Sequence, residues 1–261
     1  MATTRSSKRQ KNEPYELLYH AGIPGRGEHI RLAFEEAGVE YWDAAHNDNG
    51  ASETYPLISD KYTGNAHSPP HLAPPILRHG DLTISQTPNI LLYLGPRLGL
   101  VPDQSEDPEG IYYINQLTLT ALDGFSNEAH DTHHPIASGE YYEDQKDEAL
   151  RRAVDYRLNR IPKFLGYFER VLGSPTSQGG EYLYGGKLSY ADLVLFQTLD
   201  GVSFAFPKCV KSARESGKYG KVWALYERVK GRAKIKEYLA SDRRLKYSMG
   251  IYRHYPELDE E

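Results

Sequence analysis

The first hundred residues alternate between short apolar runs and segments with helical spacing. Residues 15–19 are apolar except for Glu16 and predict a strand. Residues 28–37 carry apolar side chains on one face of a predicted helix, and Gly38 follows where such a helix ends. A second strand is predicted over residues 39–44. This order is typical of a small β-α-β unit.

The next segments continue the same unit. Residues 47–71 are polar and rich in Gly, Ser and Pro, which predicts an unusually long loop. Residues 75–84 have apolar runs on either side of a Gly-Asp pair, which predicts a β-hairpin. Thr87 is expected to cap a helix that begins at Pro88. We therefore expect a β-α-β-β-α domain over residues 13–100.

Beyond a polar, proline-bounded linker at residues 101–108, the pattern has a helical period throughout. Helices are predicted over residues 111–127, 144–172, 190–205 and 222–240. Ser189 is expected to cap the third of these, with Asp192 reaching back to the freed backbone amide. The predicted fold class is α/β plus all-α: a β-α-β-β-α domain, then a helical bundle over residues 109–252.

Composition narrows the class of protein. The chain of 261 residues has 31 Lys and Arg against 36 Asp and Glu, so nothing indicates a nucleic-acid partner. No apolar run is long enough to span a bilayer, and the first twelve residues lack a signal-peptide core, so we expect no membrane contact and a cytoplasmic location. Basic residues between positions 5 and 11 are interpreted as a solvated terminus rather than a nuclear address. Cys209, the single cysteine, is expected to be a buried structural thiol.

Two motifs could carry chemistry on their own. The turn Gly22-Ile-Pro-Gly-Arg-Gly27 has neither the dinucleotide-binding order of glycines nor the Gly-Lys-Ser/Thr of a P-loop, so a phosphate cradle is not favoured. His130, His133 and His134 have a spacing compatible with zinc. Because no carboxylate or cysteine ligand is assured and Pro135 ends the helix, a histidine-rich pocket wall is favoured and no metal is expected.

Specific stretches together carry a family resemblance. They are Tyr15-Glu-Leu-Leu-Tyr19, Gly25-Arg-Gly-Glu28, Ala37-Gly-Val-Glu-Tyr41, Pro75-Ile-Leu77 with Gln86-Thr87, Asp123-Gly124, and Gly186-x-x-Ser189-x-x-Asp192. With the predicted order of elements, they identify the chain as resembling the cytosolic glutathione S-transferases of the tyrosine type, with a sigma, mu or pi-like pattern. The resemblance implies a thioredoxin-like N-terminal domain and a helical C-terminal domain.

The resemblance also implies a mechanism. Tyr19 matches the tyrosine that donates a hydrogen bond to the sulfur of glutathione, the implied co-substrate. Such a bond favours the thiolate over the thiol. The thiolate then attacks a small apolar electrophile.

Further positions match residues that hold the peptide. The glutathione site is implied to comprise Arg26, Lys61, Pro74, Pro75, Gln86, Thr87 and Asp123, with Pro75 matching a cis-proline and Asp123 reaching across the interface of a homodimer. The acceptor pocket is expected near His20, Ile23, His133 and Tyr252. Tyr252 belongs to a C-terminal tail that either folds over the pocket or docks on the helical domain.

One departure from the family pattern keeps other functions open. Pro74 stands where the family donates a backbone N–H to glutathione, and proline has none. A non-catalytic member that binds or regulates other proteins is therefore an alternative. A glutathione-dependent isomerase, or a biosynthetic enzyme that forms C–S bonds, is another, because the acceptor pocket has no sequence pattern of its own.

Overall fold

A mixed four-stranded sheet with helices forms the N-terminal part of the molecule. The computed structural model describes residues 13–260, so the basic residues between positions 5 and 11 lie outside it. The elements in chain order are β1 Tyr15–Leu18, α2 Glu28–Ala37, β2 Tyr41–Asp43, α3 Gly50–Thr54, β3 Ile76–His79, β4 Leu82–Ser85 and α4 Thr87–Leu98. The strands lie in the order β2-β1-β3-β4, with β1 parallel to β2 and antiparallel to β3. The predicted β-α-β-β-α unit is confirmed.

The alternation of side chains along β1 gives each face of the sheet its own core. Leu17 belongs to the large apolar cluster that includes Ile30 and Leu32 of α2. Leu18 points to the other face, where it packs with Ala44 and Ile76. This follows from the two-residue period of a strand, which sends successive side chains to opposite faces.

Two predictions in this part were wrong in detail. Residues 47–71 are not a continuous loop, because they contain α3 and a 3-10 turn, Tyr55–Ile58. Leu57 and Ile58 of that turn pack against the small cluster around Leu18, so long-range burial orders a segment whose composition is typical of loops. Thr87 is the first residue of α4 rather than its cap, a position that Gln86 takes with a positive φ of 74°.

The C-terminal part contains only helices among its described regular elements. They are α5 Gly110–Leu119, α6 Asn127–Asp131, α7 Lys146–Asp155, α8 Ile161–Leu172, α9 Tyr190–Ala205, α10 Pro207–Glu215, α11 Gly220–Lys230 and α12 Ala233–Leu239. π-helical stretches, Thr120–Ser126 and Tyr156–Arg160, join α5 to α6 and α7 to α8. The prediction missed α10. It also merged α11 with α12, which Gly231 and Arg232 separate.

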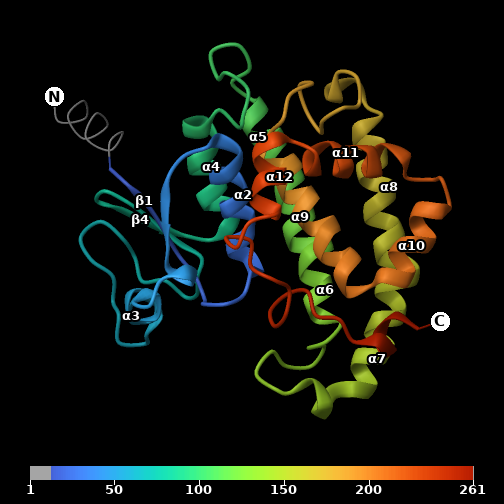
Figure 1. Ribbon diagram of the computed structural model, residues 1–261, viewed down its shortest axis with the longest axis horizontal. Coiled ribbons are helices and arrows are strands. Elements are labelled where there is room, and N and C mark those ends of the chain that lie inside the picture. The colour runs from blue at the N-terminus through green and yellow to red at the C-terminus, as the bar shows by residue number, and fades with distance from the viewer. Residues whose placement is uncertain (1–12, 261) are drawn as a thin grey trace.

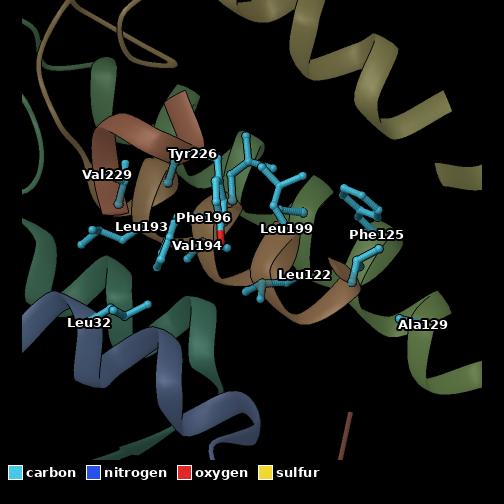
Figure 2. Packing of buried hydrophobic residues seen from close by; sticks show 14 of the residues in the cluster. Leu32, Leu122, Phe125, Ala129, Leu193, Val194, Phe196, Leu199, Tyr226 and Val229 are labelled. Carbon is cyan, nitrogen blue, oxygen red and sulfur yellow. The ribbon is translucent and has the colours of Figure 1, made fainter. Parts of the chain in front are cut away.

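Helix α9 lies at the centre of this part, with helices around it (Figure 1). Its Leu193, Val194, Phe196 and Leu199 lie among apolar side chains from several elements, including Leu32 of α2 (Figure 2). The predicted capping box is confirmed, because the backbone N–H of Ser189 donates to Asp192 Oδ2 at 2.7 Å. No single helix of residues 13–260 has the length and apolar character to cross a bilayer; α9 and α10 meet that test only as a pair, and they are bent by 116°.

Candidate active site

Three neighbouring strands end or begin at one edge of the sheet. Leu18, the last residue of β1, pairs with Ile76, the first residue of β3, and Ile76 pairs with Ser85 at the end of β4. The residues just beyond these pairs therefore lie at the same edge: Tyr19, Pro75, Gln86. The peptide bond between Pro74 and Pro75 is cis, as the resemblance implies. Sheet register thus gathers three of the predicted site residues at one edge.

The hydroxyl group of Tyr19 has a fixed hydrogen-bond partner in the structure. It is almost fully buried, and its hydroxyl oxygen accepts a hydrogen bond from the backbone N–H of Arg26 at 2.8 Å. Burial raises the pKa of Tyr19 above its ordinary value near 10, against the opposing effects of the Arg26 amide and the Arg31 charge. The hydroxyl is therefore protonated at neutral pH. Since its oxygen already accepts a bond, its own hydrogen is free to be donated.

The glycine-rich turn makes room for the Tyr19 ring. A β-carbon added at Gly25 would lie 2.2 Å from the Tyr19 hydroxyl oxygen, and one added at Gly27 would lie 2.8 Å from the ring atom Cγ. Gly25 also has a φ of +46°, which L-residues with side chains rarely adopt. The glycines of this turn therefore allow close packing against an aromatic ring, which explains a motif that matches no phosphate-binding fingerprint.

Arg26 connects the sheet edge to the helical part. Besides donating to Tyr19 through its backbone, it accepts a hydrogen bond from Thr87 Oγ1 at 3.3 Å through its carbonyl oxygen. Its guanidinium donates to the side-chain oxygen of Asn127, the first residue of α6. Both residues are predicted for the site: Arg26 bonds directly to Tyr19, and Thr87 is connected to Tyr19 through Arg26.

A cavity of about 500 Å³ opens beside Tyr19. This volume lies within the usual range for sites that bind small molecules, about 300–1,000 Å³. The residues that line it come from both parts of the chain: Tyr19, His20, Ile23, Arg26, His130, Met249, Gly250, Ile251 and Arg253. The predicted neighbours His20 and Ile23 lie at this cavity.

The structure does not bring the remaining predicted residues to the cavity lining. His133 lies behind it, with Nε2 3.0 Å from the carbonyl oxygen of Ile251. Tyr252 is buried and donates to Ser126 Oγ at 2.8 Å, so its ring docks on the helical part. Lys61 is exposed in the turn after residue 58, and Asp123 is exposed on the π-helical stretch.

The cavity also has lining residues that sequence reasoning missed. Met249, Ile251 and Arg253 belong to the irregular tail after α12, where no periodic pattern marks them. Only the general expectation that the tail approaches the pocket pointed to them. His130 was recognised as part of a histidine motif but was not placed beside Tyr19.

His29 of α2 has a lowered pKa, which predicts how the stability of the protein depends on pH. It is fully buried, and both ring nitrogens lack a hydrogen-bond partner in the described part of the chain. Burial, reinforced by the charges of Arg26 and Arg244, lowers its pKa to about 3. Below pH 6.5 the unfolded chain binds a proton there that the folded chain does not, so stability is lost as pH falls from 6.5 toward 3.

We therefore expect the free energy of unfolding of His29→Leu to fall less than that of the wild type as the pH is lowered. From pH 7.5 to 5.0 the wild-type protein should lose about 2 kcal/mol through His29, and the variant should not. Urea unfolding at both pH values measures this difference. The exposed His67→Leu is the matched control and should keep the wild-type slope. Equal slopes in His29→Leu and wild type would contradict the assignment.

Comparison with known proteins shows similarity to one family. Residues 130–242 match the family model described as "Glutathione S-transferase, C-terminal domain". The chain is 28% identical to Glutathione S-transferase P 1 of Xenopus laevis, with 89% of this chain and 95% of that protein covered. It is 26% identical to the Glutathione S-transferase of Plasmodium falciparum, over 75% of this chain and 84% of that one.

A solved structure agrees with these matches over most of the chain. The pi-class glutathione S-transferase of Onchocerca volvulus superimposes with a TM-score of 0.62 at 25% identity, covering 86% of this chain and 91% of that one. The similarity therefore extends over both the sheet and the helical part of the chain. By sequence and by fold, the chain is therefore similar to the glutathione S-transferases.

Proposed function

We propose that the protein transfers the thiolate of glutathione to small apolar electrophiles, with Tyr19 as the hydrogen-bond donor to the sulfur. The observation that carries this proposal is the Tyr19 hydroxyl, which accepts from the Arg26 amide at 2.8 Å and keeps its own proton for a second partner. The adjoining cavity of about 500 Å³ provides space for that partner and for an acceptor molecule.

The chemistry requires a thiol to become a nucleophile near neutral pH. A free thiol has a pKa of about 8.5, so most of it is protonated at pH 7. A donated hydrogen bond stabilises the thiolate by roughly 1.5–3 kcal/mol and lowers that pKa. The thiolate then forms a C–S bond at the electrophilic carbon, the leaving group departs with the bond's electron pair, and the thiol proton passes to solvent.

The peptide is proposed to lie along the sheet edge. Its backbone would meet Pro74 and Pro75, and its γ-glutamyl end would meet Gln86 and Thr87 at the start of α4, where free backbone amides favour a carboxylate. Arg26 and Lys61 are the proposed cationic contacts. Asp123, exposed on its stretch, would reach the γ-glutamyl amine of a second copy, so the proposed assembly is a homodimer. A cytoplasmic role in detoxification is part of the same proposal.

The direct test is a conjugation assay with the purified protein, glutathione and an aromatic chloro-nitro electrophile. We expect saturable formation of the thioether well above the rate of the uncatalysed reaction. S-methylglutathione, which lacks a free thiol, serves as the control and should inhibit without reacting. A rate equal to that without protein would exclude this function.

A second candidate is a non-catalytic member of the family, and Pro74 is the observation that favours it. Pro74 is buried at the sheet edge and has no N–H to offer the peptide. An unmade bond to a buried carbonyl costs about 1–3 kcal/mol. Retention on glutathione-agarose and elution with free glutathione would favour the enzyme over this alternative.

Restoring the missing donor gives a sharper prediction. Pro74→Val supplies a backbone N–H, and we expect it to lower the dissociation constant of glutathione about tenfold, because one additional hydrogen bond contributes about 1 kcal/mol or somewhat more. Isothermal titration calorimetry measures this change. Pro70→Val, at an exposed position of the preceding segment, is the control and should leave the affinity unchanged. Unchanged affinity in Pro74→Val would mean that the peptide does not use residue 74.

A further inference from the structure

Three histidines gather where α6 ends. His130 lies in the last turn of α6, and a backbone turn follows in which the N–H of His133 donates to the carbonyl of His130 at 3.1 Å. The ring centroids of His130, His133 and His134 are 4.6–5.2 Å apart. One nitrogen from each ring lies within 4.8 Å of the others, which is close enough for all three to bind a single ion.

The hydrogen bonding of His133 fixes which of its nitrogens can bind a metal ion. Its Nε2 lies 3.0 Å from the carbonyl oxygen of Ile251, which can only accept, so Nε2 carries the hydrogen. In a neutral imidazole the other nitrogen, Nδ1, then holds a lone pair. That lone pair accepts a hydrogen bond from Nδ1 of His134, and a bound metal ion would replace the hydrogen between the two nitrogens. Metal-binding histidines almost always donate their second ring nitrogen to a carbonyl or carboxylate in this way.

The cluster is partly shielded from solvent and lies between two groups of opposite charge. His133 is buried, and His130 and His134 are partly exposed. The carboxylate of Asp131 lies 3.7 Å from Nδ1 of His130 and favours a cation there. The guanidinium of Arg253, which lines the same cavity as His130, carries a positive charge that opposes a cation.

We propose that His130, His133 and His134 form a binding site for a divalent transition-metal cation of the zinc class, with a fourth coordination position left for water or another ligand. Imidazole suits zinc, copper and nickel, whereas magnesium and calcium require oxygen ligands. Three protein ligands are sufficient, because zinc sites with an open position use three. The absence of an assured carboxylate or cysteine ligand, which argued against a metal at the level of sequence, therefore does not exclude one.

The site borders the cavity beside Tyr19. His130 belongs both to the cluster and to the cavity lining, whereas the proposed peptide site lies at the sheet edge. A bound cation would therefore lie on the acceptor side of the cavity. Because the ligands are distinct from Tyr19 and the sheet edge, metal binding can be tested independently of conjugation.

Metal binding is tested with the full-length, untagged protein after treatment with a chelator and dialysis. Zn²⁺ is titrated in competition with a chromophoric chelator, and Co²⁺ is used as a spectroscopic probe. We expect one site per chain in the micromolar range or tighter, with the visible absorption of four-coordinate cobalt. His130→Ala and His134→Ala should each weaken Zn²⁺ binding by more than about 100-fold, because removing an outer partner alone costs 10- to 100-fold.

The control variants define what would overturn the proposal. His67→Ala and His46→Ala remove exposed histidines outside the cluster and should leave the affinity unchanged. Arg253→Gln removes the opposing charge and should tighten binding a few-fold. Circular dichroism checks that each variant is folded. His133→Ala is not among the primary test variants, because that side chain is buried. Absence of stoichiometric binding, or equal losses in the cluster and control variants, would overturn the site.

Discussion

Tyr19→Phe is expected to lower kcat/KM for conjugation about 10- to 100-fold at pH 6.5. The variant keeps the ring that packs on Gly25 and Gly27 but removes the only hydroxyl that the turn holds beside the cavity within the described residues. Loss of a hydrogen bond to a charged sulfur costs about 1.5–3 kcal/mol, which corresponds to a factor of this size. Steady-state kinetics with an aromatic electrophile measures the change.

The pH dependence separates this role from a structural one. If Tyr19 stabilises the thiolate, its removal raises the apparent pKa of kcat/KM by about 1–2 units toward that of free glutathione, so the variant recovers activity as pH rises. Tyr141→Phe is the control, because Tyr141 is largely exposed and distant in sequence from the turn. A lower rate with no change in apparent pKa would contradict the assignment of Tyr19 as thiolate donor.

The elements that sequence reasoning predicted best are those with local signals. Helix α2 begins and ends as predicted because its apolar period and the left-handed Gly38 lie within one short segment. Helix α9 begins as predicted because Ser189 and Asp192, three residues apart, form its cap. The residues at the sheet edge were identified through the family resemblance instead, because local strand and hairpin patterns do not determine which strands are neighbours in the sheet.

The features that were missed depend on contacts between distant segments. Helix α3 lies in a segment of loop-like composition, and the burial of Leu57 and Ile58 against the sheet orders the adjoining turn. The cavity wall formed by Met249–Ile251 comes from the irregular tail after α12, more than two hundred residues from Tyr19. A periodic pattern contains no information of this kind, because the partners are chosen by tertiary packing.

A network of buried charged side chains next to the turn also depends on contacts between distant segments. Arg31 of α2 is fully buried, and its Nε lies 2.6 Å from the carboxylate of Asp43 at the end of β2. Its Nη1 lies 3.2 Å from Glu28 and donates to the carbonyl of Pro24 at 3.0 Å. Glu28 is also fully buried and accepts from Tyr238 of α12 at 2.6 Å. Arg31 therefore connects the turn beside Tyr19 with the sheet and, through Glu28, with the last helix.

Arg31→Met is expected to lower the free energy of unfolding by about 3–5 kcal/mol, because it leaves the buried Asp43 carboxylate without its arginine partner, whereas Glu28 keeps its ion pair with Arg244. Urea unfolding at a fixed protein concentration measures the loss. Arg243→Met is the matched control: Arg243 pairs with Glu35 at 2.9 Å on the surface, and exposed pairs contribute about 1 kcal/mol or less. A loss in Arg31→Met no larger than in the control would show that the network contributes little to folding. A large loss would identify Arg31 as the residue through which the active-site turn depends on the rest of the fold.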